Sequence, residues 1–144
     1  VKNGMWIGQL LEYAGIELRD GDIISRGGPL RGECLDRLDR SITKGTTGLF
    51  VVESGTVPPM EGHSPCINCG ACVQVCPAHL NPSTLSRYAE FANYNACLAE
   101  HSTHCLECGL CGYVCIARRP VLQYIRLANA KIKEMQEFVW EENK

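Results

Sequence analysis

The feature that most constrains this chain is a cysteine run that occurs twice with the same spacing, C-x2-C-x2-C-x3-C. The first run extends from Cys66 to Cys76 and the second from Cys105 to Cys115. Ten cysteines among 144 residues are an excess that indicates either disulfides or metal. Two cysteines separated by only two residues are poorly placed for an unstrained disulfide, so the spacing favours metal. Thiols kept for metal point to a reducing compartment such as a cytoplasm.

The same spacing is typical of bacterial ferredoxins, in which three close thiolates bind one 4Fe-4S cluster and the fourth binds the other. We therefore predict two 4Fe-4S clusters with crossed ligands, in a protein whose role is electron transfer. Such cofactors carry the chemistry, while the protein sets their potential and spacing. The predicted ligands are Cys66, Cys69, Cys72 and Cys115 for the first cluster, and Cys105, Cys108, Cys111 and Cys76 for the second.

Zinc is the alternative metal. A zinc site of this class has two C-x2-C pairs separated by about fifteen residues, which close one tetrahedron. Three cysteines in quick succession do not suit that arrangement. A Rieske centre would need histidines in place of cysteines within a run, and neither run has one.

The residues that flank the two runs differ in ways that bear on the clusters. Pro77 follows the first run, whereas Ile116 follows the second, so we expect a looser chain exit after Cys115. Arg118 and Arg119 place positive charge beside that exit. Positive charge near a cluster would raise its reduction potential, and the alternative is a solvated pair at a helix start.

Two cysteines and four histidines lie outside this pattern. We interpret Cys34 and Cys97 as small buried apolar residues, because free cysteine is usually buried and inert. We interpret the histidines as surface or locally bonded residues, with a hydrogen bond from His104 to a cluster as the alternative. The histidines are His63, His79, His101 and His104.

Charge excludes nucleic acid as a partner, and hydropathy excludes a membrane-spanning helix in this sequence. The formal charge is −2 with both signs mixed along the chain, which is not the footprint of a nucleic-acid-binding protein. No apolar run approaches the roughly twenty residues of a membrane-spanning helix. The chain begins at Val1 and has no basic-then-apolar opening, so we expect a fragment or a processed chain rather than a signal peptide.

The first 54 residues are predicted to form a small α+β module, joined to residues 65–144 by a linker over residues 55–64 that is rich in turn formers. Apolar residues at helical spacing predict a helix that ends near Gly15. Residues 22–25 and 47–53 are predicted strands. The glycines between them suit turns, because no phosphate-binding motif is present.

Residues 65–144 are predicted to be helical between and after the cysteine runs. Asn81 and Pro82 form a helix start, with Leu85, Tyr88, Ala89 and Ala92 on one face, and a short helix is expected at residues 95–100. A long amphipathic helix follows Pro120, and its far end near Trp140 is a candidate docking surface, with core packing as the alternative. The apolar face of that helix is Val121, Ile125, Ala128, Ile132, Met135 and Val139.

Residues 65–80, the second cysteine run and residues 120–128 resemble the C subunit of the Rnf electron-transport complexes. Residues 27–32 and 43–48 are similar to turns of that family's soluble-ligand-binding β-grasp domain. The resemblance implies an α+β chain in which a β-grasp-like module, truncated at its N-terminus, precedes a helical module that binds two 4Fe-4S clusters.

The resemblance also implies a setting and partners. Members of the family lie on the cytoplasmic side of a membrane complex, peripheral to the inner membrane, and exchange electrons between NADH and ferredoxin while the complex moves ions. The implied partners are the other subunits and a ferredoxin or a flavin or NADH domain. The family's nucleotide- and flavin-binding domain precedes the β-grasp domain and is not in this sequence, so no catalytic residue is assigned here.

Two other functions stay open at this point. A segment of a cobalamin-reductase-like flavoprotein would have a similar layout. An assembly or ligand-binding module with purely structural clusters is the alternative from another class. Crossed ligands between two clusters weigh against the latter, since one metal would suffice as a structural staple.

Overall fold

The computed structural model describes residues 1–56, 62 and 64–142, and the side chains of these residues up to position 138. It divides into two compact units, Val1–Glu61 and Gly62–Lys144, which are described separately. Helices combine with a small antiparallel sheet, so the predicted α+β class is confirmed. The predicted domain bounds and linker stay predictions, and linker residues 57–61 and 63 lie outside the described residues.

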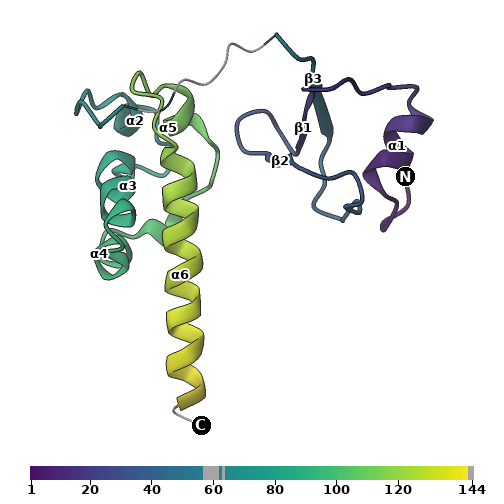
Figure 1. Ribbon diagram of the computed structural model, residues 1–144. Coiled ribbons are helices and arrows are strands. Elements are labelled where there is room, and N and C mark those ends of the chain that lie inside the picture. The colour runs from purple at the N-terminus through teal and green to yellow at the C-terminus, as the bar shows by residue number, and fades with distance from the viewer. Residues whose placement is uncertain (57–61, 63, 143–144) are drawn as a thin grey trace. The chain divides into compact units, whose positions relative to one another are not determined.

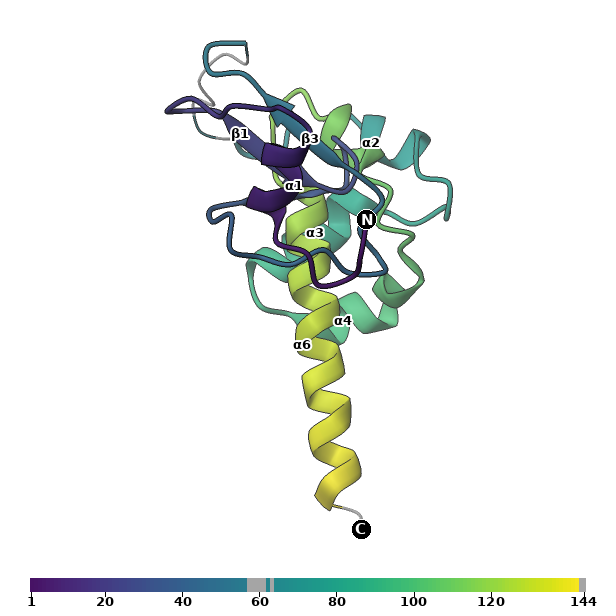
Figure 2. The ribbon, with the colours of Figure 1, turned by 90° about the vertical axis from the view of Figure 1, so that its right-hand side faces the viewer.

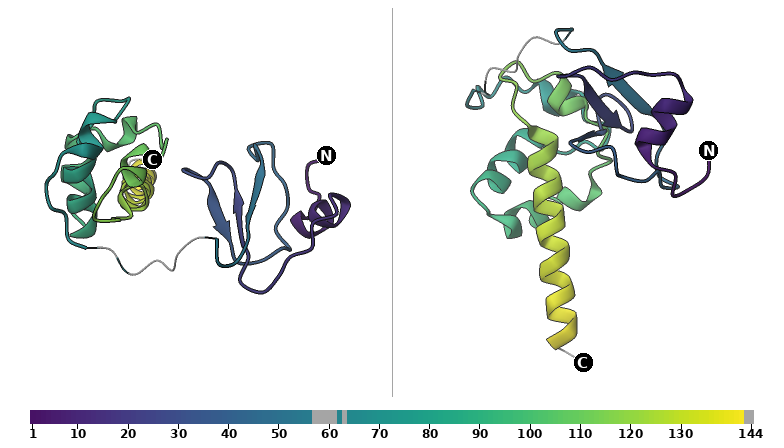
Figure 3. Two further views of the ribbon diagram at one scale, coloured as in Figure 1. Left: turned by 90° about the horizontal axis from the view of Figure 1, so that it is seen from above. Right: turned by 45° about the vertical axis from the view of Figure 1, so that its right-hand side comes forward.

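The first unit contains a three-stranded antiparallel sheet (Figures 1 and 3). Strand β1 (Ile23–Arg26) lies between β2 (Glu33–Leu35) and β3 (Leu49–Val52). Strands β1 and β3 confirm the two predicted strands. Strand β2 was not predicted, because three residues are too few to show an alternating pattern.

Helix α1 (Ile7–Tyr13) precedes the sheet (Figure 2). The Gly15 N–H donates to the Glu12 carbonyl at 3.0 Å, and the Ile16 N–H donates to the Leu11 carbonyl at 2.9 Å. This pair of bonds is a Schellman ending, which needs the left-handed φ of +68° that Gly15 adopts. The predicted helix end is therefore confirmed. The buried core of this unit is formed by Ile7, Leu11, Ile24 and Ile42.

The second unit is helical and is organised around its last helix. Helix α6 packs against α3 and α4, and α2 packs against α5. Figure 1 shows α6 as the long helix, which continues past the ends of α3 and α4, and the left view of Figure 3 shows it end-on. The elements are α2 (Ala71–Gln74), α3 (Pro82–Glu90), α4 (Tyr94–Ala99), the 3₁₀ turn η1 (Ser102–His104), α5 (Leu110–Tyr113) and α6 (Val121–Glu142).

Asparagine caps begin both helices between the cysteine runs. The Asn81 side chain accepts a hydrogen bond from the Thr84 N–H at 3.2 Å, which confirms the predicted start of α3. The Asn93 side chain accepts from the Ala96 N–H at 3.2 Å and begins α4. Helix α3 ends at Glu90, so the prediction that Ala92 extends its buried face is wrong.

The apolar face of α6 is buried over its first three turns. Val121, Ile125, Ala128 and Ile132 are each at most 3% exposed, as predicted. Met135, on the same predicted apolar face, is 44% exposed and lines a groove together with Leu98 of α4. The described part of the chain holds no helix with the combined length and apolarity that a membrane crossing requires. The side chains of Val139 and Trp140, and with them the predicted docking end, lie outside the described residues.

Candidate metal centres

The two cysteine runs adopt the same backbone conformation. In each run the residue before the second cysteine, the glycine after it and the residue three positions past the fourth cysteine have left-handed φ angles. Glycine tolerates this conformation without strain, and it begins a short helix in both runs, α2 and α5. The repeat in sequence is therefore a repeat in structure. The matching pairs, with φ angles, are Asn68 (55°) and Glu107 (50°), Gly70 (75°) and Gly109 (84°), and His79 (52°) and Arg118 (52°).

The chain leaves both runs through the same turn. The His79 N–H donates to the Cys76 carbonyl at 3.1 Å, and the Arg118 N–H donates to the Cys115 carbonyl at 3.0 Å. The expectation that Ile116 would loosen the second exit is therefore wrong. A backbone hydrogen bond closes the turn in both copies, with or without a proline.

The fold brings the predicted ligand sets to two separate cavities. Each cavity is lined by three cysteines of one run and by the fourth cysteine of the other run. That these thiols bind clusters stays a prediction, but their grouping is the one that crossed ligands require. The first cavity is lined by Cys66, Cys69, Cys72 and Cys115, and the second by Cys76, Cys105, Cys108 and Cys111.

The donor chemistry of both cavities suits an iron–sulfur cluster. Among the described residues, each lining offers four thiols and no histidine or carboxylate, which is the ligand set of a 4Fe-4S cluster. Over the described ranges, no three His, Cys, Asp or Glu side chains converge on the position of a single metal ion. The four thiols of each set instead surround a cavity.

The rest of the lining differs between the two cavities. The first cavity includes the polar side chains of Ser83, Ser86 and Arg119. The second is mainly apolar apart from its thiols, with residues such as Leu80, Leu122 and Ile125. The two sites therefore present different electrostatic surroundings to whatever they hold.

Burial raises the pKa of several of these thiols. It raises the pKa of Cys72 and of Cys105, and it raises the pKa of Cys111 to about 11, with the charge of Cys105 as the next cause. Metal-free thiols with such pKa values are protonated at neutral pH. Only thiolates bind metal, so cluster binding must release protons from this unit.

Arg119 is the buried charge at the first cavity. Its side chain is 5% exposed, and its Nη2 donates to Glu90 Oε2 at 2.7 Å. The Arg119 guanidinium carbon lies 5.4 Å from the centre of the Tyr124 ring. The solvated-pair alternative is therefore wrong for Arg119, whereas the neighbouring Arg118 is exposed. No sequence signal distinguished the two arginines.

The two cysteines outside the runs differ in burial, and His104 lies at the surface. Cys97 is fully buried, as predicted, and its thiol donates to the Leu85 carbonyl at 3.7 Å. Cys34 is exposed, so its predicted burial is wrong, because the adjacent Leu35 packs against the core and successive side chains of a strand point to opposite faces. His104 is exposed and stacks on His101 with ring centres 5.4 Å apart, in agreement with the surface interpretation. His63 lies outside the described residues.

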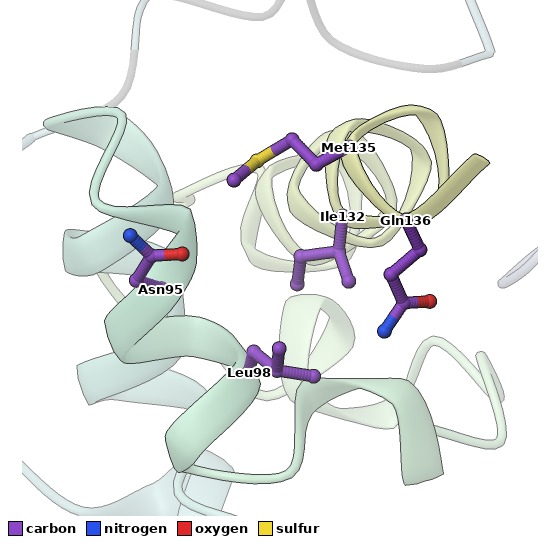
Figure 4. Close-up of a pocket in the computed structure, with 5 residues that line it drawn as sticks. All are labelled: Asn95, Leu98, Ile132, Met135 and Gln136. Carbon is purple, nitrogen blue, oxygen red and sulfur yellow. The ribbon is translucent and has the colours of Figure 1, made fainter. Parts of the chain in front are cut away.

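A further groove on this unit is lined by residues of two helices and contains no cysteine among its described lining (Figure 4). Leu98 of α4 faces Ile132 and Met135 of α6 across it. Asn95 and Gln136 supply polar groups at its sides. The exposed Met135 side chain thus lines an apolar groove between α4 and α6.

Comparison with known proteins bears directly on these sites. Residues 59–116, which include both cysteine runs, match the 4Fe-4S dicluster domain family. The chain is 35% identical over 121 residues to the C subunit of the Na(+)-translocating ferredoxin:NAD(+) oxidoreductase complex of Acetobacterium woodii, and the match covers 84% of this chain and 27% of that protein. The chain is a homologue of the Rnf C subunits.

Other Rnf C subunits match similarly. The C subunit of the proton-translocating ferredoxin:NAD(+) oxidoreductase complex of Clostridium ljungdahlii is 40% identical over 104 residues, which are 72% of this chain and 22% of that protein. The C subunit of the ion-translocating oxidoreductase complex of Pseudomonas aeruginosa is 34% identical over 134 residues, which are 93% of this chain and 17% of that protein. The resemblance to the Rnf C subunits found in the sequence is therefore confirmed.

The Rnf homology concerns one part of longer proteins. The chain spans about a quarter or less of the length of these relatives. Within that part lies the 4Fe-4S dicluster domain, and its match supports 4Fe-4S clusters as the cofactor.

Proposed function

We propose that this chain is an electron relay that holds two 4Fe-4S clusters, one in each thiol-lined cavity. The ligands of the first are Cys66, Cys69, Cys72 and Cys115, and those of the second are Cys105, Cys108, Cys111 and Cys76. The grouping of these thiols around two cavities is the observation that carries the proposal.

The closeness of the two thiol sets supports a relay. Helices α2 and α5, which begin inside the two runs, pack against each other. The pKa of Cys111, in the second set, is raised by burial, then by the charges of Cys105 and Cys108, and then by the charge of Cys72, in the first set. Two cofactors held this near to each other exchange electrons, whereas a structural role would require only one of them.

The residues of the chain have three tasks in this function. The thiolates hold the clusters, which supply one-electron chemistry when bound. The left-handed glycines let the backbone wrap closely around each site. Apolar side chains such as Leu122 and Ile125 exclude water from the second cavity, and so lower the local dielectric.

The relatives suggest the setting of this relay. We place the chain in an Rnf-type complex, on the cytoplasmic side and bound to the membrane through other subunits. Its electron partners would be a ferredoxin and a flavin or NADH domain. In this proposal the first unit, with its antiparallel sheet and one helix, is a β-grasp-like module, and the second is a helical ferredoxin-type module.

Anaerobic reconstitution tests the proposal. We expect about eight iron and eight acid-labile sulfide per chain, and a visible absorption that dithionite bleaches as an electron-spin signal appears. Cys34→Ser is a matched control, because Cys34 is exposed and belongs to neither set. About half the iron would contradict the count of two clusters, and clusters that dithionite cannot reduce would contradict the relay.

A further inference from the structure

We propose that Arg119 makes the site of Cys66, Cys69, Cys72 and Cys115 the more easily reduced of the two. This inference rests on the proposed function, and it assigns a potential-setting role to a residue that is not a ligand. It predicts both an order of the two potentials and the side chain that produces it.

The position of Arg119 carries the first step. Its side chain lines the first cavity beside the four thiols and is 5% exposed. Glu90 of α3 and the Tyr124 ring of α6 hold the guanidinium in place. The Glu90 carboxylate is 32% exposed and partly screened by solvent, whereas the Arg119 guanidinium is buried beside the cavity, so the pair presents a net positive potential to the neighbouring site.

The hydrogen bonding of Arg119 carries the second step. Within the described residues, its Nε is buried and has no hydrogen-bond partner. A buried N–H without a partner is costly, and a sulfur of a bound cluster would accept a hydrogen bond from it. The Glu90 carboxylate pairs with Nη2 only, and Arg119 lines the cavity, so a cluster bound there is a candidate acceptor for Nε.

The second site lacks a comparable buried cation among its described lining residues. Among the described residues, its cavity lining includes no arginine or lysine. The loop residue between its first two cysteines is Glu107, whereas the structurally equivalent residue of the first site is the neutral Asn68. The Glu107 carboxylate pairs with Arg126 at 2.7 Å, and both side chains are about a third exposed or more, so this pair is well screened.

The sign of the effect follows from the charges. Reduction adds a negative charge to a cluster, so a nearby cation and N–H···S hydrogen bonds stabilise the reduced form and raise the potential. A nearby carboxylate does the reverse. Arg119 therefore raises the potential of the first site, whereas Glu107, paired with Arg126 and screened by solvent, changes the potential of the second site only slightly.

Potentiometric titration of the reconstituted full chain, followed by electron paramagnetic resonance, tests this inference. The titration should show two reduction waves, one for each site. Cys66→Ser changes the electron paramagnetic resonance signal of the first site only, and so it assigns each wave to a site. We expect the higher wave to belong to the first site. In Arg119→Gln the same wave should shift so that the reduced-to-oxidised ratio falls at least tenfold, about 59 mV for one electron.

Three further variants make the test specific. Arg118→Gln removes the same charge from an exposed side chain one residue away, and it should move neither wave appreciably. Arg119→Lys keeps the charge and should restore at least half of the shift. Glu107→Gln removes a screened charge from the loop of the second site, so it should raise the lower wave by less than the shift caused by Arg119→Gln and leave the higher wave in place. This variant tests the effect of local charge even if Arg119→Gln fails to fold.

The outcomes separate this inference from the proposed function. If the wild-type chain holds no reducible clusters, both fail. If two waves are present but the higher one belongs to the second site, only this inference fails. It fails equally if Arg119→Gln moves both waves alike or neither.

Discussion

Cys115, from the second cysteine run, lines the same cavity as Cys66, from the first. Cys76 makes the reciprocal crossing into the other cavity. The fourth thiol of each run therefore ties that run to the other, and neither site is complete without both runs. Removal of Cys115 should therefore damage the site that the first run forms, and removal of Cys76 should damage the site that the second run forms.

Substitution of the crossing cysteines tests this exchange. Cys115→Ala should lose the same electron-spin signal as Cys66→Ala, because both thiols surround the first cavity. Cys76→Ala should lose the signal that Cys105→Ala loses. Iron would fall to about half in each variant by loss of one cluster. The pairing is wrong if Cys115→Ala instead resembles Cys105→Ala.

The two thiol sets were predicted from the spacing of the cysteines, and the helix caps were predictable because they depend on local chemistry. Asn81 caps α3 and Gly15 ends α1 through bonds to nearby residues of the chain. The burial of Arg119 was not predictable, since it depends on Glu90 of α3 and Tyr124 of α6. The exposure of Met135 likewise depends on a groove that α6 forms with Leu98 of α4.

The left-handed turn at Gly70 gives a stability prediction. A Cβ at Gly70 would meet no atom within 4 Å, so Gly70→Ala adds backbone strain without a steric clash. We expect a loss of about 1–2 kcal/mol in the free energy of unfolding. Gly112→Ala is the matched control, because Gly112 lies in α5 with equally open space and ordinary helical φ. That substitution should be neutral or stabilise by up to about 1 kcal/mol. Urea titration of both variants measures the difference, and equal losses would contradict the argument.

The cap of α3 gives a second stability prediction. Asn81→Ala removes the acceptor for the Thr84 N–H and should cost about 1 kcal/mol. Asn95→Ala, at an exposed position inside α4, should change stability by less than about 0.5 kcal/mol. Chemical denaturation of the reconstituted chain, monitored by helical circular dichroism, compares them. A larger loss in Asn95→Ala would show that the cap does not limit stability.

The buried face of α6 gives the largest expected loss. Ile125 is 1% exposed and also lines the second cavity, so Ile125→Ala should cost about 2–5 kcal/mol and leave a void beside the thiols. Leu127→Ala, on the same helix, changes a side chain that is 45% exposed and should cost far less. Thermal and urea unfolding rank the two variants. If Leu127→Ala is the more damaging, α6 does not pack in the register described.

Asp22 gives a pH prediction for the first unit. Its carboxylate accepts hydrogen bonds from the Arg19 N–H at 2.9 Å and from the Ser54 N–H at 2.8 Å, and these bonds hold the pKa of Asp22 below its usual value. A carboxyl whose folded pKa is lowered contributes stability that is present above its unfolded pKa, about 3.9, and is lost as pH falls through the folded pKa. Asp22→Asn should therefore speed amide exchange around Ser54 at pH 7.

Hydrogen exchange of the full chain, followed over the peptide that contains β3 and Ser54, measures this effect at each pH. The difference between wild type and Asp22→Asn should be constant from pH 7 to about pH 5 and should shrink below about pH 4, because protonation removes the wild-type carboxylate as well. Asp20→Asn removes the same charge two residues away and keeps both hydrogen bonds, so it should exchange like the wild type. A difference that persists unchanged at low pH would show that the protection around Ser54 does not depend on the charge of the Asp22 carboxylate.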